Sequence, residues 1–307
     1  MIRVFRVVRG AHGRLRPLVT RPAATNHATA TDHTDYTEMI DRAEPLDSFA
    51  TTIGSLVRYR TLLGKLVLKD LKLKYRGSVL GFLWSLVNPL VMIAVYSLAF
   101  RYILRTQTEG FVFLVLLGIL AWTFFANAAM MSTGAIADSG PLLKSVFFPR
   151  AILPIATVLF NFAQYLLMAV VFLPVMMIAF GVRPAPPLLA YPVFLALQVL
   201  FTIGVALILA TGTTFFRDVR HLLEVALAVL FWTTPIVYEL QQVPERFRLL
   251  VLASPLSPFV VSYKDVFFYR RWPEPAVWTF AIAYAIIAFA VGAALLLAYE
   301  DRFAERV

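Results

Sequence analysis

LVLKDLKLKYRGSVLGFLWSLVNPLVMIAVYSLAF, the stretch Leu66–Phe100, joins a basic segment to an apolar run that carries no charge. The basic segment ends at Arg76, and the next charged residue is Arg101. A helix with Lys and Arg on its polar side and Leu on its apolar side is expected to lie in the headgroup layer of a membrane. About twenty apolar residues are then enough to cross the hydrocarbon. We therefore expect an interfacial helix over about 55–76, followed by a first membrane span over about 82–104.

The composition predicts an integral membrane protein. Of the 307 residues, 60% are hydrophobic and 15% are charged, and the mean hydropathy is +0.76. A soluble core could not bury so much apolar surface. The formal net charge is +10, but the Lys and Arg residues lie between apolar runs and not on one soluble face. We therefore attribute them to membrane topology and expect no nucleic-acid partner.

Charge-free runs predict six membrane-spanning helices, because a charge in the middle of a bilayer is costly. The fifth span is the least regular, since only Val225–Tyr238 is free of charge there. Six spans place both termini on one side. In the orientation with cytoplasmic termini, twenty of the 28 Lys and Arg residues face the cytoplasm, as the positive-inside rule requires. The expected spans are 82–104, 111–133, 151–180, 187–214, 221–239 and 276–298.

A short apolar segment precedes the last expected span. LLVLASPLSPFVVSY (Leu249–Tyr263) is too short to cross the bilayer, and two prolines, Pro255 and Pro258, interrupt it. Such a segment is typical of a re-entrant or interfacial hairpin. We therefore expect a re-entrant segment over about 247–268, and the fold class is all-α: an integral membrane protein with six spans, an N-terminal interfacial helix and a re-entrant helical hairpin.

KDLKLKYRGSVLGFLWSLVNPL closely resembles the opening signature of the type-2 ABC exporter permeases that move O-antigen, teichoic acid and related polysaccharides. In that family, a basic-Asp-Leu-Lys-x-basic-Tyr-x-x-Ser-x-Leu-Gly run precedes the first span, with a Trp and a Pro inside the span. The resemblance extends over roughly Leu46 to Arg306. The matching positions in this sequence are Lys69, Asp70, Leu71, Lys72, Lys74, Tyr75, Ser78, Leu80, Gly81, Trp84 and Pro89.

Residues 1–45 differ from the remainder. They combine an Arg-rich start with a polar, Thr- and Ala-rich run of low complexity, and no apolar signal core follows the basic start. We expect a disordered extension over 1–45 and one ABC-2 type transmembrane domain over 46–307. Because the resemblance begins after this extension, we hypothesise that the chain starts at Met39 and not at Met1. A native peptide from residues 22–38 in mass spectrometry would contradict this.

The resemblance implies a gate at the interfacial helix, which would guide cargo at the membrane surface. A plain cytoplasmic anchor before the first span is the alternative. The candidate gate residues are Lys69, Asp70, Lys72, Lys74, Tyr75 and Arg76.

GPLLKSVFFPR (Gly140–Arg150) joins the second and third expected spans on the cytoplasmic side. The resemblance implies that it holds a short coupling helix that docks on an ATPase. We expect its Leu and Phe side chains to be exposed towards the cytoplasm, where they need an apolar partner or the headgroup layer. A loop merely anchored at the membrane is the alternative. The candidate coupling residues are Leu142, Leu143, Lys144, Phe147, Phe148, Pro149 and Arg150.

The resemblance also implies a gate at the re-entrant segment, for which the candidates are Pro255, Pro258, Lys264 and Asp265. Lys264 stands where the family usually has Arg, so an Arg-specific bidentate contact has no basis here. A loop cap without a role in transport is the alternative.

Aromatic and amide side chains within the spans are candidates for contact with a sugar chain, although packing explains most single aromatics in membrane helices equally well. Asn88, Asn127, Asn161 and Gln164 suit either a lumen or a helix–helix contact. The candidate channel residues are Tyr96, Trp122, Phe125, Asn127, Tyr165 and Trp232.

The sequence contains no nucleotide-binding P-loop and no cysteine, and its four His residues are scattered. We therefore expect no catalytic residue, no metal site and no cofactor on this chain, with ATP and Mg²⁺ bound by a partner subunit.

By the resemblance, the chain is a homodimeric permease subunit that works with a separate ABC nucleotide-binding ATPase. It would export lipid-linked polysaccharide outwards, in contact with membrane lipid, from a multi-pass position in the bacterial cytoplasmic (inner) membrane with both termini cytoplasmic. One alternative is an ABC-2 permease that exports a small amphiphile or drug. The other is a membrane scaffold or enzyme component that transports nothing.

Overall fold

Helices make up almost all of the regular structure, because long apolar runs can satisfy their backbone hydrogen bonds in a membrane only internally. The computed structural model describes residues 59–77, 81, 83–99, 110–140 and 148–299, all within the unit Ser48–Val307, and these residues contain no strand. The expected extension over 1–45 lies outside the described residues. The helices are α3 (Arg60–Tyr75), α4 (Leu83–Leu98), α5 (Phe111–Ser132), α7 (Ile152–Ala179), α8 (Tyr191–Phe215), α9 (Val219–Thr233), α10 (Glu245–Leu252), α11 (Ser257–Phe267) and α12 (Pro275–Tyr299). Short 3-10 turns lie at η2 (Ala137–Ser139), η3 (Pro186–Ala190) and η4 (Leu240–Gln242).

Four of these helical segments are long and apolar enough to cross a membrane: α5, α7, η3 together with α8, and α12. The pair α10 and α11, which bends by 112°, makes a fifth if it is counted as one broken span. α4 is apolar but has only 16 residues, and α9 has 15. The described residues thus confirm the all-α prediction, whereas six spans, the interfacial helix and the re-entrant hairpin stay predictions.

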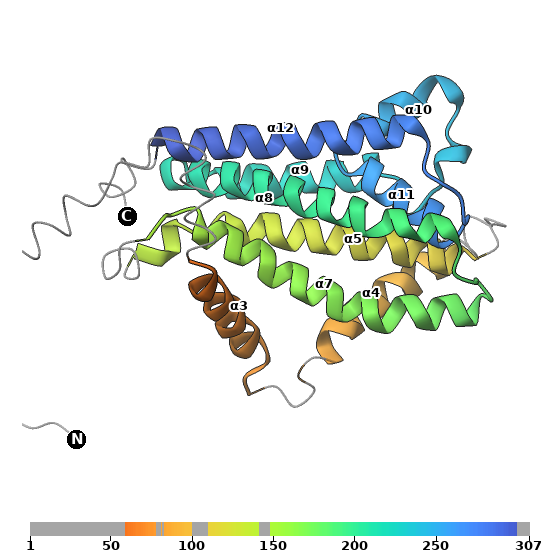
Figure 1. The fold of residues 1–307 in the computed structure, drawn as a ribbon, viewed down its shortest axis with the longest axis horizontal. Coiled ribbons are helices and arrows are strands. Elements are labelled where there is room, and N and C mark those ends of the chain that lie inside the picture. The colour runs from red at the N-terminus through yellow and green to blue at the C-terminus, as the bar shows by residue number, and fades with distance from the viewer. Residues whose placement is uncertain (1–58, 78–80, 82, 100–109, 141–147, 300–307) are drawn as a thin grey trace, which may run out of the picture. The chain divides into compact units, whose positions relative to one another are not determined.

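α5 lies at the centre of the bundle and packs against α4, α7, α8, α9 and α11, while α12 runs alongside α8 (Figure 1). Phe113, in the first turn of α5, and Phe124, in its second half, are both fully enclosed. α8 and α12 approach each other most closely at two glycines. A Cβ atom on Gly204 would lie 2.3 Å from the backbone of Ala288, and one on Gly292 would lie 2.3 Å from the Gly204 carbonyl oxygen. Small residues allow such backbone contact, which holds membrane helices together.

α11 is enclosed by α5, α8 and α12, and every one of its residues is buried. α10, by contrast, has only Leu252 buried. Pro258 lies in the first turn of α11, where a missing N–H costs nothing.

α3 crosses one end of α7 at a steep angle to the other helices (Figure 1). Leu62, Leu63 and Leu66 of α3 pack against the start of α7, whereas Leu68 and Leu73 are each 56% exposed. This helix therefore covers α7 with one face and leaves apolar side chains uncovered on another.

Candidate functional site

A pocket of about 180 Å³ opens where α3, α4, α5 and α7 meet. Its lining combines a cation, an indole and several amides, which is an unusual mixture between apolar helices. The lining residues that the argument uses are Lys74 and Tyr75 from α3, Trp84, Ser85 and Asn88 from α4, Asn127 from α5 and Gln164 from α7.

Lys74 projects from the last turn of α3 into the pocket. Its ammonium donates a hydrogen bond to Gln164 Oε1 and lies 5.9 Å from the centroid of the Phe160 ring. Partial burial lowers the pKa of Lys74 below the ordinary value of a lysine, because desolvation disfavours the charged form. The ammonium thus combines a charge with incomplete hydration, which strengthens its attraction for an anion.

Gln164 is 5% exposed, and its Nε2 atom has no hydrogen-bond partner among the described residues. Buried amide groups almost always find a partner in native structures. The carbonyl of this side chain already accepts from Lys74, so the amide N–H groups remain as donors at the pocket. A ligand oxygen would satisfy them.

The turn between α3 and α4 is held at its two ends. The hydroxyls of Tyr75 and Ser85 are 2.9 Å apart, so they link the end of α3 to the start of α4. Gly77 and Gly81 have φ angles of +75° and +47°, in the left-handed region that other residues avoid. Glycine is therefore favoured at both positions. Gly81 also lines the pocket.

The predicted channel residues lie in four different places in the structure. Tyr96 stacks on Phe231 with ring centroids 5.8 Å apart, and Trp122 contacts the same ring edge-on at 5.3 Å. Phe125 lies beside Trp122, so the cluster joins α4, α5 and α9. Asn127 lines the pocket, and Trp232 is 62% exposed on α9. Tyr165 lies in the core, where its hydroxyl is 2.8 Å from that of Tyr191.

Lys264 and Asp265, the charged residues of the expected re-entrant segment, both bind other parts of this chain. Lys264 is 4% exposed and donates to the carbonyl oxygens of Pro235, Ile236 and Tyr238 at 2.6, 3.1 and 2.9 Å. Asp265, also buried, pairs with Arg271 at 2.7 Å. Lys264 thus supplies hydrogen bonds to the backbone carbonyl groups of the segment that follows α9. This contact escaped the sequence analysis, although Pro235, which breaks the helical pattern, was a signal that unpaired carbonyls would follow.

Tyr269 closes the outer side of this region with a hydrogen bond to Glu239. Burial, and next this bond, raise the pKa of the Tyr269 phenol. The phenol therefore stays a neutral donor.

Most of the predicted coupling residues, namely Leu142, Leu143, Lys144 and Phe147, lie outside the described residues. Pro149 is buried, Arg150 is partly exposed, and Phe148 is only 6% exposed. The expectation of an exposed Phe148 is wrong. Its ring packs with Ile152 and Leu153 beneath α3, which a local apolar pattern could not reveal.

Of the remaining predicted gate residues, Lys69 and Asp70 form a surface ion pair at 3.4 Å. Lys72 and Arg76 are exposed. None of these four lines the pocket, so the structure brings only Lys74 and Tyr75 of the predicted gate to it.

Comparison with known proteins identifies the family to which this chain is similar. Residues 61–268 match the family described as ABC-2 type transporter. The chain is 32% identical to the O-antigen export system permease protein RfbA of Myxococcus xanthus, over 83% of this chain and 98% of that protein. It is 30% identical to the RfbA protein of Klebsiella pneumoniae, over 65% and 77% respectively. Identity to the polysialic acid transport protein KpsM of Escherichia coli is 21%, over 77% and 92%. The chain therefore belongs to the ABC-2 type transporter family.

Proposed function

We propose that this chain is the permease subunit of an ATP-driven ABC exporter that moves lipid-linked polysaccharide outwards across the bacterial cytoplasmic membrane. Membership of the ABC-2 type transporter family and several apolar helices make it a membrane permease and not itself an ATPase. The relatives carry the names of O-antigen and polysialic acid transport proteins, which supports a glycan as cargo.

The single observation that carries the proposal is the chemistry of the pocket between α3, α4, α5 and α7. Lys74 offers a positive charge for a phosphate of a lipid carrier. The unsatisfied amide of Gln164 offers donors to phosphate or sugar oxygens. Trp84, 58% exposed at the pocket, offers a flat apolar face on which a sugar ring can stack. A lipid-linked glycan carries these three groups close together near its headgroup: a phosphate anion, sugar hydroxyl groups and a sugar ring.

The side of the bundle that carries the pocket supports a channel between two copies of the chain. Asn88 and Asn127 are exposed there although they belong to apolar helices. Polar side chains of this kind are unfavourable against lipid hydrocarbon and are found at helix contacts or water-filled paths. A homodimer would cover this side and place the aromatic cluster of Tyr96 and Trp122 along the cargo's path.

The proposal includes a separate ABC ATPase that binds ATP and Mg²⁺, because this chain has no P-loop. The predicted coupling residues around Gly140–Arg150 would meet it. We retain six spans with both termini cytoplasmic, in which α4 and α9 cross the membrane with their flanking residues. α3 lies at the cytoplasmic surface as the gate helix, and α10 and α11 form the re-entrant hairpin.

A permease for a small amphiphile is the second candidate, since the pocket volume of about 180 Å³ suits a headgroup as well as a small molecule. A deletion strain separates the two. Glycan export predicts accumulation of lipid-linked polysaccharide inside the cell, whereas export of an amphiphile predicts sensitivity to that compound and an unchanged glycan.

The test of the pocket uses the same strain, complemented with Lys74→Gln and, as a matched control, Lys65→Gln. Lys65 is exposed on the same helix and is not part of the pocket. A hydrogen bond to a charged group is worth about 1.5–3 kcal/mol, so Lys74→Gln should lower surface glycan at least about tenfold at equal protein level. The control should restore export. Full export by Lys74→Gln would remove the pocket from the proposal.

A further inference from the structure

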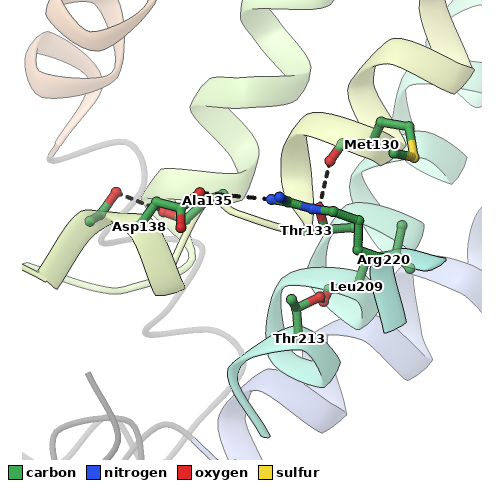
Figure 2. Close-up of polar contacts among 8 residues, drawn as sticks. Met130, Thr133, Ala135, Asp138, Leu209, Thr213 and Arg220 are labelled. Carbon is green, nitrogen blue, oxygen red and sulfur yellow. Dashed lines mark hydrogen bonds and ion pairs between the residues drawn. The ribbon is translucent and has the colours of Figure 1, made fainter. Parts of the chain in front are cut away.

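The chain between α5 and α7 is tied to the first turn of α9 by one side chain, Arg220 (Figure 2). Arg220 Nε donates to Thr133 Oγ1 at 3.1 Å, and its guanidinium also lies 3.8 Å from the carboxylate of Asp138. The hydroxyl of Thr133 donates its own proton to the Met130 carbonyl at 2.7 Å. Its oxygen therefore remains an acceptor for Arg220, and the arrangement is chemically consistent.

The segment that Arg220 contacts is held by local hydrogen bonds over Thr133–Ser139. The Asp138 amide donates to the Gly134 carbonyl at 2.9 Å, and the Ser139 hydroxyl donates to the Ala135 carbonyl at 2.8 Å. Gly134 lies directly against the Asp138 carboxylate, since a Cβ atom on Gly134 would lie 2.1 Å from Asp138 Oδ2. Ile136 is fully buried. Thr133–Ser139 thus behaves as a small rigid unit that begins at α5 and includes η2.

α9, the other side of this contact, buries little of its surface. Only Leu227 of its residues is buried, while Leu223, Leu230 and Phe231 pack partly against the core. Its far end is held by Lys264, which caps the backbone beyond Thr233. Its near end is held by Arg220. An α-helix of this length is stiff, so a displacement at its first turn reaches its last turn, where Phe231 belongs to the aromatic cluster and Trp232 contacts Phe231.

We propose that Arg220 is a positioning residue for transport. It joins the rigid unit Thr133–Ser139 to α9, so that a displacement of this unit by the ATPase moves α9 and the aromatic side chains on it. The proposal rests on the proposed function, since it needs a partner that drives the cycle. In this proposal, Thr133 and Asp138 are the residues through which the displaced unit acts on Arg220.

Because this ion pair contributes little to folding stability, an effect of its loss on transport can be told apart from an effect on stability. The side chains of Arg220 and Asp138 are 47% and 76% exposed, and exposed ion pairs contribute little to folding. A purely structural role therefore predicts almost no effect of losing the pair. A positioning role predicts normal folding with less glycan exported for each ATP hydrolysed.

The experiment measures that ratio in proteoliposomes that contain the permease, the ATPase encoded with it and lipid-linked glycan. Arg220→Glu should assemble with the ATPase and hydrolyse ATP, but should export at least fivefold less glycan per ATP. Arg183→Glu is the matched control. It makes the same charge reversal at an exposed arginine between α7 and η3, away from this contact and outside the proposed gates. The control should leave the ratio unchanged.

A second variant keeps the test independent of folding. The chain has no cysteine, so Asp138→Cys together with Arg220→Cys introduces its only two thiols. Before cross-linking, the double variant should be as poorly coupled as Arg220→Glu. A short bis-maleimide that bridges the two thiols should raise the ratio again, because it restores the connection without the ion pair. Normal coupling by Arg220→Glu, or no gain on cross-linking, would overturn the proposal. If the unmodified permease couples no export to hydrolysis, the proposed function itself fails, which is a distinct result.

Discussion

Replacing Lys264 by Met should destabilise the protein strongly, because Lys264 is the donor to three carbonyl oxygens. Met has a similar length and is apolar, so it fills the space while leaving the carbonyls of Pro235, Ile236 and Tyr238 without this donor. Each lost bond from a charged donor is worth about 1.5–3 kcal/mol, so the three together give a loss of at least about 4 kcal/mol in the free energy of unfolding before any offset. Removing a buried charge offsets part of this loss, because the desolvation of the ammonium is no longer needed.

Thermal unfolding of the protein in nanodiscs measures the effect. Lys264→Met should lower the unfolding midpoint clearly, whereas Lys65→Met, the same change at an exposed position on α3, should leave it unchanged. Lys264→Arg retains donors and should fall between Lys264→Met and the unmodified chain. A midpoint for Lys264→Met equal to that of the control would refute the view that this side chain stabilises the break after α9.

Three further predictions follow from packing and charge. Gly204→Leu should prevent close contact between α8 and α12, because its Cβ would lie 2.3 Å from the backbone of Ala288; a normal yield of folded protein would contradict this. Phe148→Asp should reduce the folded yield, since it buries a carboxylate beneath α3, whereas Phe147→Asp should lower export at normal yield. Binding of a diphosphate headgroup should weaken as the pH rises through the lowered pKa of Lys74, because only the ammonium attracts it. In isothermal titration, Lys74→Arg should bind the headgroup up to a higher pH, and an identical pH profile would exclude Lys74 as the ligand cation.

The helices could be predicted from the sequence because membrane spans follow from local composition. The charge-free run after Arg76 locates α4, and the apolar run after Gly110 locates α5. Local composition also singles out the amide side chains of the pocket as candidates, although not their contacts. Asn88, Asn127 and Gln164 stand out as polar residues in apolar runs, although their meeting with Lys74 in one pocket depends on how four helices pack.

Other parts of the site depend on tertiary contacts that no local pattern contains. Phe148 is expected to be exposed because it lies in the short segment that joins the second and third expected spans, yet α3 covers it from far away in the chain. Lys264 finds its acceptors almost thirty residues earlier, where α9 ends. Arg220 contacts Thr133 across a separation of 87 residues. The contacts of these side chains depend on where helices begin and end. Helix ends are difficult to locate from a single sequence.

Export by the purified system tests the central claim most directly. The permease and its neighbouring ATPase would be reconstituted into liposomes with lipid-linked polysaccharide on the ATP-accessible side, and glycan reaching the opposite side would be measured. The account predicts glycan transfer that requires ATP and falls at least about tenfold with Lys74→Gln, while Lys65→Gln transfers normally. Absence of ATP-dependent transfer despite a stable complex with the ATPase would contradict it.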